Sequence, residues 1–147
     1  MIKDIVTGLV ETYKTTDPFE ICDNLNIKIM HNELGREIKG FFQRTPSGYE
    51  ILHLNTELMP EEERYICAHE LGHAILHVDL SLKFFIENRL QVKNKFEIQA
   101  DKFAAEILIS DVDIPAIKGM SVEQLSYYYK VPINLIKYKF NAGSIQT

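Results

Sequence analysis

The spacing of apolar residues changes twice along this chain, and these two changes restrict the fold more than any other feature. Residues 27–30, 38–44 and 49–54 alternate between apolar and polar, with turn residues at 45–48, which predicts three strands. Before them, Asp17 and Pro18 are typical of a helix start. Nearer the N-terminus the apolar residues recur every three or four positions, as in an amphipathic helix: Ile2, Ile5, Val6, Leu9, Val10 and Tyr13.

Helical spacing returns after Pro60, where a proline and three acids suit the first turn of a helix. A further helix is expected from about Phe96 to Ile109, whereas residues 78–95 carry a weak pattern typical of a mobile loop. Two short helices are expected between Ser121 and Lys139, broken near Pro132. The sequence therefore predicts an α+β fold: a small, mostly antiparallel three-stranded sheet packed on the helix from Pro60, with N-terminal helices and a helical C-terminal tail.

The composition fits one domain spanning residues 1–147 with a core of its own, because 46% of the residues are hydrophobic and 25% are charged. It excludes disordered and collagen-like chains, and the net charge of -5 argues against binding nucleic acid over the whole surface. Two cysteines, Cys22 and Cys67, are too few for a disulfide framework. Neither a signal peptide nor an apolar run of about 20 residues is visible. We expect a soluble cytoplasmic protein that does not enter a membrane.

The residues with the clearest chemistry are His69-Glu70-Leu71-Gly72-His73, within the helix predicted from Pro60. Residues four apart on a helix lie about 6 Å apart along its axis and about 40° around it, so the two imidazoles can share one metal ion. Glu70 projects on the same side and can reach a metal-bound water without being a ligand, as a general base must. The structural alternative is that the histidines only pair with neighbours. Cys67 faces away and is expected to be a small core residue.

Two histidines leave a tetrahedral site incomplete, so a third ligand must come from elsewhere. On an unbroken helix His77 is about 12 Å from His69, and it is better explained as a helix-end residue or as a partner of a ligand histidine. Glu97 is the better candidate, and Asp101, on the same helix face, can accept the free ring N–H of a ligand histidine. An ordinary solvated pair of acids is the alternative. Small residues would let this helix pack closely on the helix of the histidines: Ala100, Ala104 and Ala105.

Two segments of the chain resemble the ImmA/IrrE metallopeptidases. They are His69-Glu70-Leu71-Gly72-His73-Ala74-Ile75-Leu76-His77 and Glu97-x-x-Ala100-Asp101-x-Phe103-Ala104-Ala105-x-Ile107-Leu108. The Glu-x-x-x-Asp spacing also resembles that of thermolysin-like zincins, and the similarity covers about residues 20–110. The chain departs from the family at Ser110, where proline is common, and at Asp101, which is often Asn. These departures concern the helix end and the tuning of a histidine rather than the predicted ligands.

The resemblance implies a zincin-like active-site helix and a zinc ion held by His69, His73 and Glu97, with Asp101 supporting a histidine. It also implies that Glu70 is the general base for attack of water on a peptide bond. Sites built from two histidines and one glutamate accept several divalent ions, and zinc is the default for this ligand set.

The residue that would stabilise the oxyanion is not evident from the sequence. Tyr65, His53 and the tyrosines at 127–129 are candidates, each with a structural role as the alternative. The strand at Ile51–Leu54 resembles the strand that precedes the family's active-site helix. By analogy with zincins, we expect it to hold an extended substrate by edge pairing.

Residues 118–140 resemble a helix-turn-helix in outline, with Ser121 as a cap and Val131 in the turn. This segment is locally basic, but Lys137, Lys139 and neighbouring polar residues are few for a helix that reads DNA. A helical hairpin that packs on the catalytic core or meets a protein partner explains it better. We expect no direct binding of nucleic acid.

Three hypotheses of function follow. The first is a zinc-dependent endopeptidase which, by family resemblance, cleaves a helix-turn-helix transcriptional repressor encoded beside it on a phage or mobile element. The second is a non-proteolytic anti-repressor that sequesters its regulator while the metal serves folding. A third, a DNA-binding regulator, depends on the C-terminal tail alone. The sequence does not predict the oligomeric state.

Overall fold

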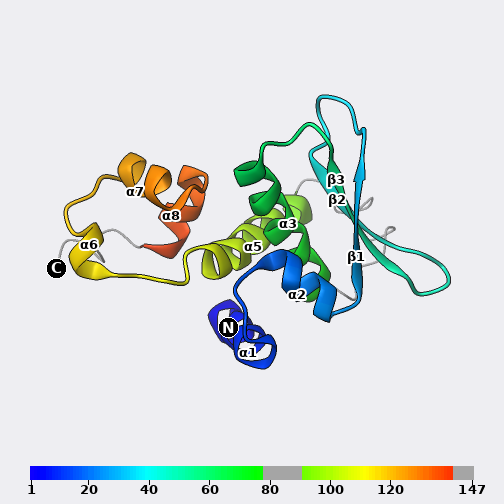
Figure 1. Cartoon of the computed structure of the whole chain (residues 1–147), viewed down its shortest axis with the longest axis horizontal. Helices are drawn as coiled ribbons and strands as arrows, with labels where there is room; N and C mark the ends of the chain where they lie inside the picture. Colours follow the sequence, from blue (N-terminus) through cyan, green and yellow to red (C-terminus); the bar gives the residue numbers. More distant parts are fainter. Residues whose placement is uncertain (78–90, 141–147) are drawn as a thin grey trace.

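A computed structural model describes residues 1–77 and 91–140 of the chain. The first half contains α1 (Ile2–Tyr13), α2 (Pro18–Asn24), β1 (Ile27–Asn32), β2 (Gly40–Arg44) and β3 (Glu50–Asn55). The second half contains α3 (Pro60–Leu76), α5 (Gln91–Leu108), α6 (Ile114–Ile117), α7 (Val122–Tyr129) and α8 (Ile133–Lys139). Figure 1 shows α3 and α5 at the centre, with the sheet on one side and α7 and α8 on the other. The predicted α+β class and three-stranded sheet are confirmed.

The helix starts follow from local capping. The Asp17 carboxylate accepts a hydrogen bond from the backbone N–H of Phe19 at 2.9 Å, and Pro18 occupies the first turn of α2. In α7, Ser121 and Gln124 form a reciprocal capping box. The helices α7 and α8 lie where two short helices broken near Pro132 are expected.

The sheet is mixed, with the strand order β1-β3-β2. The turn at residues 45–48 makes β2 and β3 antiparallel, whereas β1 pairs in parallel with β3. The alternating pattern indicated strands but carried no information on their order. Because β3 lies in the centre with a neighbour on each side, the expected edge pairing of a substrate with Ile51–Leu54 is wrong. Within the described part of the chain, β2 is the edge strand that packs beside α3.

The core lies between the sheet, α3 and α5. Leu52 and Leu54 of β3 are fully buried, and the buried residues of α3 lie between Ile66 and Ala74. The close packing of α3 on α5 expected from small residues is confirmed. A Cβ built on Gly72 would lie 3.1 Å from the carbonyl oxygen of Ala100 and 3.1 Å from Cβ of Phe103. This crossing sets the distance between the two helices.

The helix α5 begins at Gln91, five residues before the expected start at Phe96. The first turns of α5 are polar and lack an apolar stripe, so the spacing of apolar residues does not reveal them. Of the segment 78–95 expected to be a loop, residues 78–90 lie outside the described residues and residues 91–95 are helical.

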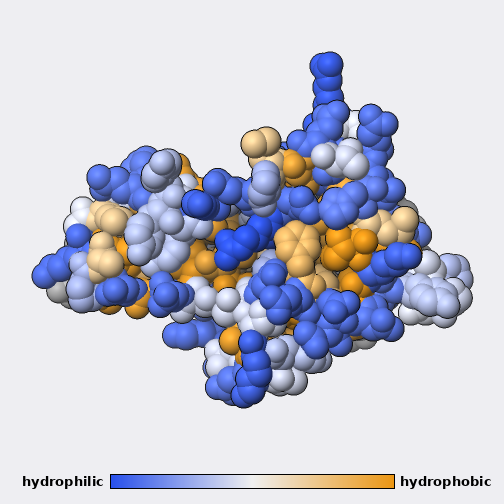
Figure 2. Space-filling model, in the orientation of Figure 1, coloured by the Kyte–Doolittle hydropathy of each residue, from blue (hydrophilic) through white to orange (hydrophobic). Residues whose placement is uncertain are grey.

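The C-terminal helix α8 packs on α5. Leu135 and Ile136 are buried, and the ammonium of Lys139 pairs with the carboxylate of Glu106 at 2.7 Å. Figure 2 shows apolar residues toward the middle of the viewed face, between the hydrophilic side chains that cover most of it. Among the described helices, none combines the length and the apolar character needed to cross a bilayer.

Candidate active site

Side chains from two helices converge beside the crossing of α3 and α5. The two carboxylate oxygens of Glu97 each lie 2.9 Å from Nε2 of a histidine, Oε2 from His69 and Oε1 from His73. The two imidazole centroids are 4.8 Å apart with planes at 83°. The structure thus brings together the three residues that the sequence proposes as ligands. Two imidazole nitrogens and one carboxylate are a donor set that suits a catalytic divalent metal such as zinc.

Local structure explains this convergence. The unbroken helix α3 presents His69 and His73 on one side, one turn apart. The close approach of Gly72 to Ala100 brings α5 near enough for Glu97 to reach both rings. The His69 side chain is 10% exposed and that of Glu97 is 48% exposed, so the site is open to solvent on the Glu97 side.

Glu70 lies next to the two histidines. One ligand atom from each of His69, Glu70 and His73 lies within 4.8 Å of the others. Burial raises the pKa of the Glu70 carboxyl above its usual value, whereas the neighbouring histidines act in the opposite direction. A carboxylate of raised pKa is a better proton acceptor, as a general base requires.

The carboxylate of Asp101 joins three elements. Its Oδ1 accepts hydrogen bonds from Nδ1 of His69 and from the hydroxyl of Tyr65, both at 2.8 Å. Its Oδ2 accepts a hydrogen bond from Nδ2 of Asn134 on α8, also at 2.8 Å. The bond from Nδ1 fixes the orientation of His69 and turns its Nε2 toward Glu97. Sequence reasoning identified Asp101 but missed Asn134, which lies 33 residues away.

These contacts also set the charge of His69 in the metal-free protein. Burial lowers the pKa of the imidazole, but the hydrogen bonds to Asp101 and Glu97 outweigh it and raise the pKa to about 10. The same bonds from His69 and His73 hold the pKa of Glu97 well below its usual value. His69 and Glu97 therefore form an ion pair, and a metal that bound at Nε2 of His69 would have to displace the proton there.

His77 is the C-terminal cap residue of α3, as the sequence predicts, and it also contacts His73. Its Nε2 donates to Oε1 of Gln99 at 2.9 Å, and its Nδ1 lies 2.9 Å from Nδ1 of His73. Burial lowers the pKa of His77, which favours the neutral ring, and Nδ1 of a neutral His77 accepts a hydrogen bond from Nδ1–H of His73. This series of hydrogen bonds from Gln99 through His77 leaves Nε2 of His73 facing Glu97. Sequence reasoning missed Gln99, because a lone glutamine carries no signal.

Two of the candidate oxyanion donors, His53 and Tyr65, have their polar groups engaged with other side chains. His53 lies on the sheet, where its ring bonds to Asn32 and Gln43 and stacks on Phe41 with centroids 4.4 Å apart. The hydroxyl of Tyr65 is near the site but donates to Asp101.

The remaining residues singled out from the sequence lie apart from the metal donors. Tyr127 is 88% exposed on α7, and the hydroxyl of Tyr129 donates to the carbonyl of Asp111. Cys67 is fully buried beside Cys22, which confirms its expected place in the core.

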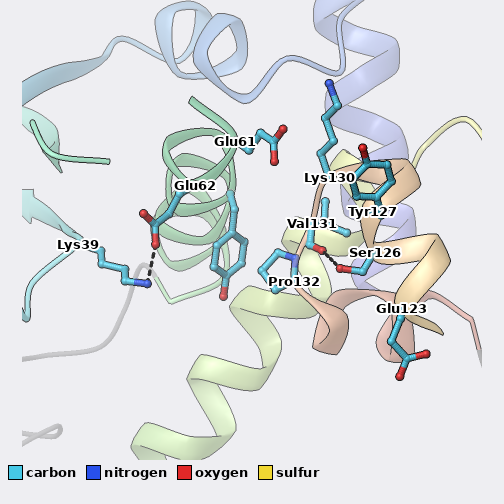
Figure 3. Close-up of a pocket in the computed structure, with 10 residues that line it drawn as sticks. Lys39, Glu61, Glu62, Glu123, Ser126, Tyr127, Lys130, Val131 and Pro132 are labelled. Atoms are coloured by element: carbon cyan, nitrogen blue, oxygen red, sulfur yellow. Dashed lines mark hydrogen bonds and ion pairs between the residues drawn. The ribbon is translucent and has the colours of Figure 1, made fainter. Parts of the chain in front are cut away.

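A cleft of about 700 Å³ lies beside the metal donors rather than over them. Figure 3 shows it between the first turns of α3 and the turn that joins α7 to α8. Tyr65 lines the cleft, and its hydroxyl donates to Asp101. The cleft therefore extends to the hydrogen bonds that orient His69. The other lining residues are Lys39, Glu61, Glu62, Glu123, Ser126, Tyr127, Lys130, Val131 and Pro132.

Known proteins give an independent comparison. Residues 22–141 match the family model of the IrrE N-terminal-like domain. The chain is 33% identical over 145 residues to "Metallopeptidase ImmA" of Bacillus subtilis (strain 168), which covers 95% of this chain and 84% of that protein. It is 32% identical over 141 residues to "Uncharacterized immunity region protein 2" of Bacillus phage phi105. That match covers 95% of this chain and 89% of the phage protein.

A solved structure shares the fold. The "Mycobacterium tuberculosis transcriptional regulator" superposes with a TM-score of 0.59 at 14% identity, over 92% of this chain and 46% of that regulator. At this identity the match concerns the fold alone, and the chain spans less than half the length of that protein. The family model and the two Bacillus relatives cover nearly the whole chain, including the histidines and Glu97, and the chain belongs to the ImmA/IrrE family of metallopeptidases.

Proposed function

We propose that this chain is a zinc-dependent endopeptidase that cleaves a helix-turn-helix transcriptional repressor and so relieves repression. The observation that carries the proposal is the convergence of His69, His73 and Glu97, with 2.9 Å between the carboxylate oxygens and each Nε2, and with Glu70 alongside. This donor set suits a catalytic zinc site with one position open to water or substrate. We assign His69, His73 and Glu97 as zinc ligands and Glu70 as the general base.

The side chains of this protein have separate roles in the proposed reaction. A divalent cation held by His69, His73 and Glu97 would supply Lewis acidity and would make water acidic enough to react near neutral pH. Glu70 accepts the proton of the attacking water and delivers it to the leaving amine nitrogen. Asp101 holds His69 through its Nδ1, and His77 with Gln99 holds His73 in the corresponding way. The free edge of β2, beside α3, is the strand available to pair with an extended substrate.

The choice of substrate class rests on the relatives. One curated relative is named for an immunity region of a Bacillus phage and another is a metallopeptidase from Bacillus. A protease that serves such a region would act on the protein that maintains immunity, a DNA-binding repressor. The cytoplasm is where such a substrate lies.

The test is cleavage of the purified repressor encoded beside this chain. The wild-type protein should cut it at a defined bond, and Glu70→Gln should bind zinc but lose at least about 100-fold in rate, the scale of general-base catalysis. Glu11→Gln, on the exposed face of α1, is the matched control and should cut like wild type. A Glu70→Gln variant that cuts at the wild-type rate would refute the mechanism. A repressor that is inactivated but stays intact on a gel would favour sequestration instead.

A further inference from the structure

The Asp101 carboxylate is the point where the C-terminal hairpin, defined here as α7 and α8 with their connecting turn, meets the metal donors. Two hydrogen bonds to Oδ1 come from α3, and the bond to Oδ2 comes from Asn134 on α8. The Asp101 side chain is only 13% exposed. A carboxylate that is buried to this extent needs partners for both oxygens, because an unpaired buried charge is costly.

Asn134 is itself held firmly in place. It lies in the first turn of α8 and is followed by Leu135 and Ile136, whose side chains are buried in the core. The helix therefore presents the Nδ2 donor at a fixed position. If this donor is removed, Asp101 can rotate about its terminal torsion, and the bond that orients His69 loses its fixed acceptor.

We infer that Asn134 is a positioning residue for the metal site, so that the C-terminal hairpin completes the site rather than serving only as an appended module. This inference rests on the proposed zinc ligands. It assigns the hairpin a task that its helix-turn-helix outline does not suggest. The acting group is the amide N–H of Asn134, which holds Asp101, which in turn holds His69.

The test measures zinc affinity by competition with a chromophoric chelator, without any substrate. Asn134→Ala and Asn134→Asp should each bind zinc about 10- to 100-fold more weakly than wild type, the usual effect of losing an outer partner of a metal-ligating histidine. The Asp variant has nearly the same shape but replaces the donor by an acceptor facing Asp101. Should Asn134→Ala fail to fold, Asn134→Ser removes the same donor and carries the same expectation.

Two controls separate positioning from general damage. Lys139→Ala loosens the other end of α8 without touching Asp101, and Asn24→Asp makes the same chemical change on α2, where Asn24 donates to the carbonyl of Glu20. Both should bind zinc like wild type. Asn134 variants within about twofold of wild type, or a Lys139→Ala variant that loses as much affinity as Asn134→Ala, would overturn the inference. Failure of the wild-type protein to bind zinc would instead refute the proposed function.

Discussion

Replacing Gly72 by alanine tests whether the crossing of α3 and α5 sets the geometry of the metal donors. The added methyl group would lie 3.1 Å from the carbonyl oxygen of Ala100, 3.1 Å from Cβ of Phe103 and 3.2 Å from Cα of Ala100. These are backbone atoms or the first carbon of a side chain, and none of them can rotate away. The helices must therefore separate by a few tenths of an ångström.

Two opposing effects decide the change in stability. Alanine in place of glycine in a helix interior stabilises by about 0.5–1 kcal/mol. Overpacking of a filled core costs about 1–3 kcal/mol. We expect Gly72→Ala to lower the free energy of unfolding by about 1 kcal/mol, which corresponds to a fall of about 3 °C in Tm for a chain of this size. The shift of α5 also displaces Glu97, and metal–ligand distances tolerate only about 0.2 Å.

The assay is urea unfolding of the metal-free protein, followed by zinc competition with a chelator. Gly8 provides the matched control, because it lies within α1 and no atom lies within 4 Å of a Cβ built there. Gly8→Ala should stabilise the protein by about 0.5–1 kcal/mol and leave zinc affinity unchanged. If Gly72→Ala stabilised the protein as much as Gly8→Ala and bound zinc normally, the helix crossing would not determine the site.

Three further predictions concern the metal and the thiols. Elemental analysis should find about one zinc per wild-type chain and far less in Glu97→Ala; equal contents would remove Glu97 from the ligand set. Because contacts with Asp101 and Glu97 outweigh burial and raise the pKa of His69 to about 10, zinc uptake near neutral pH should release a proton, seen as buffer-dependent heats in calorimetry. Heats that do not depend on the buffer would contradict this. The neighbouring Cys22 thiol and burial raise the pKa of the Cys67 thiol, so thiol reagents should modify these cysteines only after unfolding.

Local patterns in the sequence predict most of the helices and strands, although not the short α6, and they indicate the candidate site residues. The i, i+4 spacing of His69 and His73 and the spacing of Glu97 and Asp101 are short-range relationships on two helices. Each pair can be read without knowing how the helices meet. The structure then places the pairs face to face.

The features that the sequence did not predict depend on contacts between residues far apart in the chain. Asn134 reaches Asp101 across 33 residues and Gln99 reaches His77 across 22, and nothing in the local sequence marks either side chain. The central position of β3 also follows from strand pairing rather than from alternation, which is the same for edge and central strands. Polar partners of this kind become visible only when the helices are packed.

The position of Asn134 in the chain has a consequence for biosynthesis. The Asp101 cluster joins Tyr65, His69 and Asn134 across separations of 36, 32 and 33 residues, so α3, α5 and α8 must all be in place before it exists. Asn134 is also translated after His69, His73 and Glu97. A chain still emerging from the ribosome already carries both histidines and Glu97. It does not yet carry Asn134, which holds the Asp101 carboxylate against His69. A fully supported metal site would thus form only after α8 has been synthesised and has packed on α5.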